Sequence, residues 1–571
     1  MDLSALGGDP GAPLPDPVTG WSAPATDEMQ LIRTTGAFRR ADNRPRLNGA
    51  DADPTVHTEA LLAGFRAAYD AIAAGRDQLA GLLAGFATDE TRVLLRHTWQ
   101  YTTLLDESTH PDLLRDAADR DRLLDVLWRD SAGDPLLRAL VDTELADLRA
   151  GDVPLITARP ADRSLRLGRR TVADAVAESG HDWARRRLAA MGRTDRYDQE
   201  WVIRAALAVR KGEREHRPGA LPPGPVSAIV PDQERLLAAA CGIADQILAG
   251  AQDDGRHVNW LGLEPLEGDL HWALLPQGAG LPHGYCGTAL FLAQLAGLTG
   301  VERYAAVARR ALTPIPALLS ALGEQPAELP FIGAGFSGLG GIAYALALLA
   351  GLLDDPDLSS WAATAVGLAA TAAGTGADPG VLHGDAGCLA ALLAVHRTTG
   401  LQAAWDTARV SARRLLARPV DDLSTGGFTD GAPGIGWALL RFADAGGGPD
   451  YAEAGLDRLR AAALHHPPDQ VRDSRAGWCT GASGLALAVA DRAAGDADPR
   501  LAALLDAVTT ASTRHGVTAD HSLCHGETGL LELLLAATAA GRAAPGAALP
   551  RAGALLAALD RFGPRCGTPT R

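Results

Sequence analysis

Cysteine is scarce in this chain, and long apolar runs are missing. Six cysteines among 571 residues cannot form the dense disulfide framework of a small secreted protein. The longest apolar stretch, GIAYALALLAGLL at residues 341–353, is shorter than the roughly 20 residues that a membrane-spanning helix needs. The first residues, MDLSALGGDPG, contain neither a basic segment nor an apolar core, so we expect no secretory signal and a reducing, cytoplasmic location.

Positive charge and aromatic residues are also in short supply. Lys and Arg total 53 against 69 Asp and Glu, which gives a formal net charge of −16. Because binding to phosphate backbones needs clustered Lys and Arg, this balance argues against nucleic acid as a partner. Aromatics make up only 5% of residues, and with abundant Ala, Leu and Gly this favours close-packed helices over sheets. The length of 571 residues predicts two or more domains.

A short pattern recurs six times in the second half of the chain. Each copy has a small or polar pair, a glycine, two variable residues, a second glycine and then an apolar run. The first glycines are 54, 46, 47, 50 and 45 residues apart, and they are Gly284, Gly338, Gly384, Gly431, Gly481 and Gly526. A regular period of this length indicates repeated helix pairs.

Each repeat has room for two helices of different character. The run after the glycines is apolar on nearly all sides, as expected for a buried inner helix. The intervening segments are amphipathic: in residues 401–417, Trp405 and Ala412 share a face that Leu415 and Leu416 continue, while Arg414 belongs to the polar remainder. Such pairs stack into an open solenoid or close into a ring, and inner helices this apolar favour a closed α/α toroid. Because glycine permits a positive φ and close backbone approach, we expect the six loops to meet at one end of the ring.

The ring would gather the polar residues that precede the glycines. They are His283, Ser337, His383, Asp430, Cys479 with Thr480, and Cys524 with His525. Cys479 and Cys524 lie in neighbouring repeats, so the ring would make them adjacent. Two thiolates and an imidazole are ligands that zinc prefers, and three protein ligands leave one position open, as in catalytic zinc sites. Spacing alone leaves an alternative, in which both cysteines are buried apolar residues and His525 is a polar cap.

The last two repeats carry a family resemblance. GWCTGASGLALA and LCHGETGLLELL, after four Gly-x-x-Gly repeats, make the region of about residues 230–571 similar to the cyclase domain of lanthionine synthetases. The resemblance implies an α/α toroid in which Cys479, Cys524 and His525 hold one zinc ion. It also implies the reaction: a cysteine of a precursor peptide takes the open position as a thiolate. The thiolate adds to a dehydroalanine or dehydrobutyrine of the same peptide, and a nearby acid protonates the enolate to leave a thioether ring.

The chain departs from that family beside the expected site. Asp430 replaces the usual histidine of the fourth repeat, and His283 stands where the first repeat usually has Asp. Thr480 follows Cys479, where His, Asn or Tyr is more familiar. Asp430, His283 or His383 could supply the acid, and each could instead be a loop cap. These departures put turnover in question more than metal binding.

A second resemblance covers the first part of the chain. The proline- and glycine-rich residues 216–232 are typical of a linker. Upstream of them, segments such as TRVLLRHTWQYTTLL, HPDLLRDAADRDRLLDVLW and GDVPLITARP resemble, in order, the C-terminal part of the dehydratase domain of class II lanthipeptide synthetases. We therefore expect a fold dominated by α-helices, with a mostly helical fragment of a kinase-like dehydratase at residues 1–215 and a toroidal cyclase domain at residues 233–571.

The second resemblance implies further chemistry. Such dehydratases use ATP and Mg²⁺ to phosphorylate Ser or Thr of the precursor, and then eliminate the phosphate. The elimination residues map onto Arg92 and Thr98, and a guanidinium suits a departing phosphate. The alternative is that Arg92 pairs with Asp89 or Glu90 on a solvated face. Because the family's kinase residues would lie upstream of the first match, we expect that this chain alone cannot phosphorylate. Either it is a truncated fragment or another polypeptide supplies the rest, and ATP and Mg²⁺ are used only if that missing dehydratase part is supplied.

Three functions therefore compete. The leading one is a zinc-dependent lanthionine cyclase fused to an incomplete dehydratase, with a leader-bearing precursor peptide as substrate. A separate dehydratase portion and an export transporter are its possible further partners. The second is a zinc- and peptide-binding scaffold without turnover, or one subunit of a split enzyme. The third and weaker one, a toroidal glycosidase or transferase, needs paired carboxylates, for which only Asp430 and Asp385 offer themselves.

Overall fold

A computed structural model of the chain describes residues 18–23, 26, 30–34, 45–209, 230–253, 257–265, 272–375, 378–419, 427–466, 477–491, 498–514 and 520–566. It divides into two compact units, one of Glu59–Glu200 and one of Met1–Thr58 together with Trp201–Arg571. The expected linker at residues 216–232 falls largely outside the described residues. The boundaries of the sequence-based domains stay predictions.

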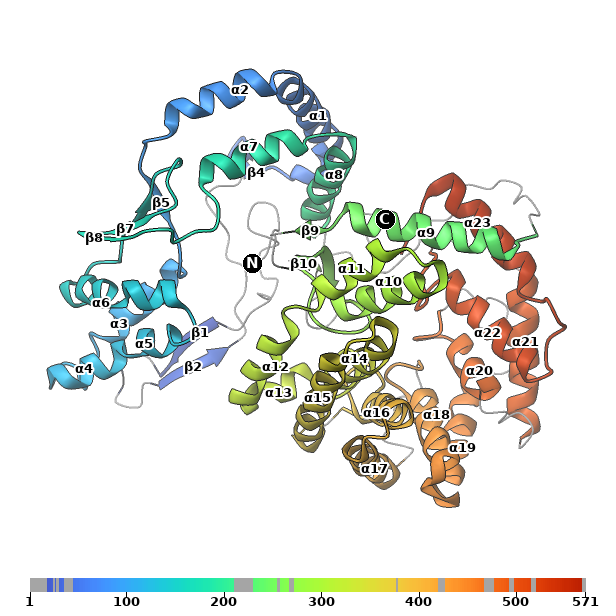
Figure 1. Ribbon diagram of the computed structural model, residues 1–571. Helices are drawn as coiled ribbons and strands as arrows, with labels where there is room; N and C mark the ends of the chain where they lie inside the picture. Colours follow the sequence, from blue (N-terminus) through green and yellow to red (C-terminus); the bar gives the residue numbers. More distant parts are fainter. Residues whose placement is uncertain are drawn as a thin grey trace. The chain divides into compact units, whose positions relative to one another are not determined.

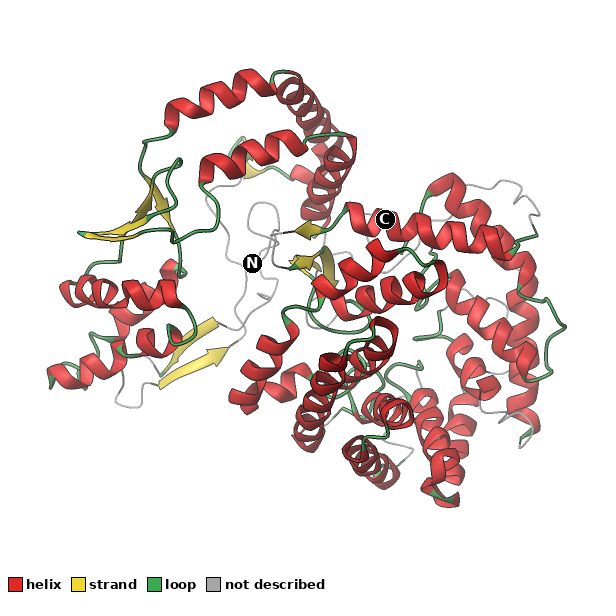
Figure 2. Ribbon diagram, in the orientation of Figure 1, coloured by secondary structure: helices red, strands yellow, loops and turns green. Residues whose placement is uncertain are grey.

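The unit Glu59–Glu200 is mostly helical and carries one small antiparallel sheet (Figures 1 and 2). The strands pair in the order β5 (Thr91–Val93), β6 (Ile156–Ala158), β7 (Leu165–Leu167) and β8 (Arg170–Val172). The helices are α1 (Thr58–Ala74), α2 (Arg76–Leu83), α3 (Thr98–Glu107), α4 (Ala117–Leu124), α5 (Val126–Asp130), α6 (Pro135–Ala150), α7 (Gly180–Ala190) and the first half of α8 (Arg193–Ala208), which continues past the end of this unit.

Helix α6 is the centre of this unit's core, and its ends follow from its sequence. The carboxylate of Asp134 accepts hydrogen bonds from the backbone N–H groups of Leu136 and Leu137, while Pro135 occupies the first turn, where no N–H is needed. Gly151 ends the helix with a φ of 86°, which glycine adopts without strain. Between these ends, one face of α6 is buried, with Leu140, Val141, Leu145 and Leu148 at its core.

Two rings of helices form the larger unit (Figure 1). The inner helices contact one another in order, and they are α10 (Tyr285–Thr299), α14 (Leu339–Leu353), α16 (Asp385–Thr399), α18 (Ala432–Phe442), α20 (Ala482–Asp491) and α22 (Glu527–Ala539). Each contacts the outer helix that follows it, and these are α11 (Glu302–Ala311), α15 (Pro356–Thr375), α17 (Gln402–Ala417), α19 (Pro449–Ala463), α21 (Pro499–Arg514) and α23 (Leu549–Phe562). The ring closes through α9 (Gln233–Ala249), which contacts both α10 and α23. The predicted α/α toroid is therefore confirmed.

The two rings differ in burial as their sequences predict, with one correction. Inner helix α14 is buried on most of its surface, whereas outer helix α17 buries one face, which includes Ala412. On α17 the prediction was wrong for two residues. Leu416 is 36% exposed, and Arg414 instead turns inward, with its Nε 3.1 Å from the carboxylate of Asp385. A buried counter-charge on the inner helix thus outweighs the hydrophobic pattern at the end of α17.

Short strands are the main addition to the predicted helical fold (Figure 2). In the larger unit β1 (Val18–Ser22) pairs with β2 (Gln30–Thr34), and β3 (Arg46–Leu47) pairs with β4 (Ala50–Asp51). Between α9 and α10, β9 (Gln252–Asp253) pairs with β10 (Val258–Asn259), and β11 (Leu261–Pro265) with β12 (Trp272–Pro276). Among the described helices, none combines the length and the apolar character that a membrane crossing requires.

Candidate metal centre

The six Gly-x-x-Gly loops all lie at the N-terminal ends of the inner helices. Backbone hydrogen bonds join the second to the sixth loop in chain order: Phe336 N–H donates to Val381, Val381 to Thr429, Thr429 to Cys479 and Cys479 to Cys524. Their N···O distances are 3.1, 2.6, 3.1 and 3.4 Å. The loops therefore meet at one end of the toroid, as predicted, and the two cysteines lie on hydrogen-bonded neighbours.

The glycines serve close packing and not an unusual backbone conformation. Those that cap the inner helices have negative φ angles, such as −127° at Gly526, so the expected positive φ is wrong. A Cβ atom at Gly484 would instead overlap the carbonyl oxygen of Trp478, and one at Gly529 would overlap that of Leu523. Each loop folds back over the start of its own helix so tightly that no side chain fits between them.

Cys479, Cys524 and His525 form a compact cluster of potential ligands. One ligand atom from each lies within 4.8 Å of the other two. The Sγ of Cys479 is 3.0 Å from Nε2 of His525 and 3.8 Å from the hydroxyl of Thr480. Cys479 is 3% exposed, while the other two are half-buried, so the cluster is covered on one side and open on the other.

The cluster favours a negatively charged sulfur. Hydrogen bonds from the thiol of Cys524 and from His525 lower the pKa of Cys479 to about 5, against the opposing effect of burial. The pKa of Cys524 is raised, because its proton is held by the hydrogen bond to Cys479 and because it is partly buried. One thiolate is thus stabilised beside the imidazole.

The donor set fits zinc. Zn–S bonds of about 2.3 Å and Zn–N bonds of about 2.0–2.1 Å place ligand atoms roughly 3.5–4 Å apart in a tetrahedral site. The three atoms here come close to that spacing, and two sulfurs with one imidazole nitrogen are a zinc-preferring set. Elsewhere in the described part of the chain, no other group of His, Cys, Asp and Glu has this arrangement.

The three proposed acids lie on three of the glycine loops, and all three are exposed. Asp430 is exposed on the loop joined to that of Cys479, and its Oδ2 accepts a hydrogen bond from the Thr429 hydroxyl at 3.0 Å. Its charge acts on Cys524. His383 and His283 are exposed on the third and first loops, and neither belongs to the ligand cluster.

Two buried acids form a structural feature that the sequence analysis did not identify. Asp385 and Glu527 each follow the first glycine of their repeat directly, and each pairs with an arginine of the next outer helix. These partners are Arg414 on α17 and Arg551 on α23. The acids are 3% and 0% exposed, so Asp385 cannot supply the second carboxylate of a glycosidase at the loop end. The signal in the sequence was the acid shared by HGDAG and HGETG.

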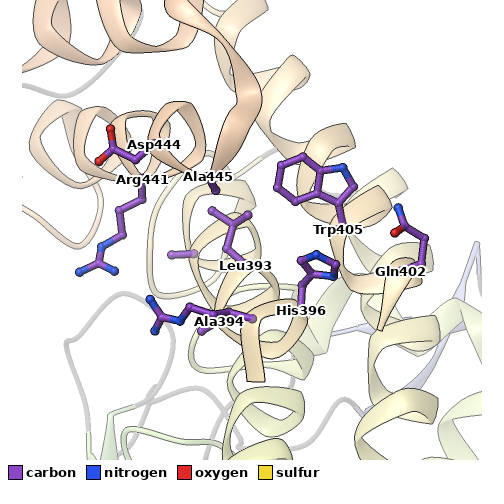
Figure 3. Close-up of a pocket in the computed structure, with 10 residues that line it drawn as sticks. Leu393, Ala394, His396, Gln402, Trp405, Arg441, Asp444 and Ala445 are labelled. Atoms are coloured by element: carbon purple, nitrogen blue, oxygen red, sulfur yellow. The ribbon is translucent and has the colours of Figure 1, made fainter. Parts of the chain in front are cut away.

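One cavity lies away from the ligand cluster. It has a volume of about 770 Å³ and lies between the C-terminal ends of α16 and α18 and the start of α17, at the end of these helices remote from the glycine loops. Trp405, His396 and Gln402 line one side, and Arg441 and Asp444 line the other (Figure 3). Arg441 is held by Asp491 and Trp437.

Arg92 and Thr98 lie in the other unit. Arg92 is an exposed residue of β5, and Thr98 is the first residue of α3. Glu90, one of the two suggested partners of Arg92, instead lies 3.4 Å from Arg166. Arg96, which lies between Arg92 and Thr98 in the sequence, is buried and pairs with Glu144 at 3.2 Å, so it is part of the core.

Comparisons with known families agree with this architecture. Residues 276–540 match the model of the family described as lanthionine synthetase C-like protein. Residues 1–159 match a domain of unknown function, DUF4135. These two domains in this order are the architecture of the C-terminal part of class II lanthipeptide synthetases. No curated protein matches the chain.

Proposed function

We propose that the chain is a zinc-dependent lanthionine cyclase. Its substrate would be a leader-bearing precursor peptide in which Ser and Thr residues have been dehydrated. The observation that carries this proposal is the convergence of Cys479, Cys524 and His525 from two neighbouring loops, within a region that matches the model of the lanthionine synthetase C-like family.

Cys479, Cys524 and His525 would hold the zinc ion. When bound, zinc keeps the sulfur of a substrate cysteine in its thiolate form at neutral pH. The chain orients this site by burying Cys479 and fixing its carbonyl with Thr429, while Cys524 and His525 are only half-buried and so can be reached from solvent.

Ring closure needs one proton at a defined carbon. The substrate sulfur releases its proton to solvent and bonds to the β-carbon of the dehydro residue. The electrons of the carbon–carbon double bond move toward the carbonyl, and the α-carbon then takes a proton from an acid. We assign this acid to Asp430, which is exposed beside the cluster and regains its proton from solvent. His383, one loop before Asp430 in the hydrogen-bonded series, and His283, on the first loop, are the other candidates.

A cyclisation assay tests the proposal. The probe is a synthetic peptide with one dehydroalanine and one cysteine a few residues apart. Ring closure leaves its mass unchanged, so the readout is loss of the thiol that N-ethylmaleimide would label. We expect the full chain with zinc to close the ring, and Cys479→Ala and Cys524→Ala to lose both zinc and activity. Stoichiometric zinc without ring closure would overturn the cyclase and favour the scaffold.

Arg92 and Thr98 are proposed to serve phosphate elimination. Arg92 is exposed and its nearest acidic neighbour in sequence pairs elsewhere, which supports a free guanidinium over a surface ion pair. A phosphoserine peptide tests this without ATP. We expect release of phosphate by the full chain, and a loss of at least tenfold in Arg92→Ala, which removes a charge-assisted hydrogen bond. Arg170→Ala, on β8, is the control that removes another exposed arginine. Phosphate release by Arg92→Ala equal to that of the wild-type chain would contradict the assignment.

A further inference from the structure

The loop of the fourth repeat has two polar residues, Thr429 and Asp430, directly before its first glycine, where most other loops have only one. Two positions before the first glycine, the six repeats have Pro282, Phe336, Leu382, Thr429, Cys479 and Cys524. The last two of these are the proposed ligands. Thr429 therefore holds, one loop earlier, the position that the metal-binding thiols hold in the next two repeats. Its neighbour Asp430 holds the position of His525.

Thr429 is buried and connects two groups of the site. It is 2% exposed, and its hydroxyl lies 3.0 Å from Oδ2 of Asp430 and 3.2 Å from the carbonyl oxygen of Cys479. The backbone N–H of Thr429 donates to the same carbonyl at 3.1 Å. Because the N–H already joins the two loops, the hydroxyl is not required for that link, and its hydrogen is available to the carboxylate.

We propose that Thr429 is a positioning residue that holds the carboxyl group of Asp430 toward the substrate. This inference rests on the proposed function, since it presumes that Asp430 delivers the proton. A carboxyl group on an exposed loop residue rotates freely unless a neighbour fixes it. The buried hydroxyl of Thr429 fixes one carboxyl oxygen of Asp430 relative to the backbone of Cys479. When Asp430 carries the proton, its carboxyl O–H donates a hydrogen bond to the oxygen of the Thr429 hydroxyl. That hydroxyl then donates its own hydrogen to the Cys479 carbonyl.

Thr429→Val tests this role, because valine has the shape of threonine without the hydroxyl. The backbone N–H bond to Cys479 is retained, so the loops stay joined and zinc content should be unchanged. With the dehydroalanine–cysteine peptide, we expect kcat to fall roughly ten- to hundredfold, the cost of losing a hydrogen bond to a charged group, with KM unchanged. Thr429→Ser restores the hydroxyl and should return kcat to within about threefold of wild type.

A matched control and a double variant separate positioning from general structure. Thr509 is a buried threonine on α21, away from the loops, and Thr509→Val should leave zinc content and kcat unchanged. If Thr429 acts through Asp430, then adding Thr429→Val to Asp430→Ala should cause no further loss. A wild-type kcat in Thr429→Val, loss of its zinc, or an additive loss in the double variant would each overturn the inference. Failure of the wild-type chain to cyclise would instead overturn the proposed function.

Discussion

At the residue scale, the sequence allowed us to predict the three metal ligands but not the buried residues that surround them. Cys479, Cys524 and His525 could be identified because the repeat makes distant residues equivalent, and equivalent positions in neighbouring repeats become neighbours in the ring. Thr429 and the acids Asp385 and Glu527 gave weaker signals, since their roles depend on partners that the repeat does not specify.

The buried acid–arginine pairs predict unequal effects of similar substitutions. Glu527→Gln removes the carboxylate that pairs with Arg551, whose side chain is 5% exposed, and we expect a loss of about 3–5 kcal/mol in the free energy of unfolding. Asp385→Asn should cost less, because the side chain of Arg414 is 30% exposed and can turn to solvent. Denaturant unfolding of the two variants measures this difference. Equal losses would contradict the account of their burial.

At the scale of elements, the alternation of inner and outer helices followed from the hydrophobic pattern. Apolar runs after each glycine pair became inner helices, and amphipathic segments became outer ones. The short strands were not foreseen, because segments of two to five residues carry too few side chains to show a period. The role of the glycines was predicted wrongly for a related reason. The sequence shows the position of each glycine but not the backbone atoms that pack against it in the folded chain.

The tight loops predict that a single methyl group damages the metal centre. Gly484→Ala would push a Cβ into the carbonyl of Trp478, beside Cys479, and we expect a loss of about 1–3 kcal/mol in stability together with weaker zinc binding. Gly297→Ala on α10 is the control, because nothing lies within 4 Å of its Cβ and alanine favours a helix. Thermal unfolding compares the stability of the two variants, and zinc titration compares their affinity for zinc. A Gly484→Ala protein as stable as Gly297→Ala would refute the packing argument.

At the scale of the whole molecule, the closed ring is what turns six separate loops into one site. The ring could be anticipated from the number and apolar character of the inner helices, but its closure through α9 could not, since α9 lies outside the repeats. The ligands come from two loops, so an ion bound to them would join two repeats of the toroid.

Metal removal should therefore lower the stability of the whole toroid. An ion that binds only the folded state stabilises it by about 4 kcal/mol at a thousandfold excess over its dissociation constant. We expect a chelator to lower the Tm of the wild-type chain by several degrees and to leave the Tm of Cys524→Ala unchanged. The same shift in both proteins would show that the chelator acts elsewhere.

X-ray absorption at the zinc edge of the purified full chain tests the central claim most directly. The account predicts one zinc per chain with two sulfur neighbours near 2.3 Å and nitrogen or oxygen in the remaining positions, and the loss of one sulfur in Cys479→Ser. A chain without zinc, or zinc bound with no sulfur neighbour, would contradict it.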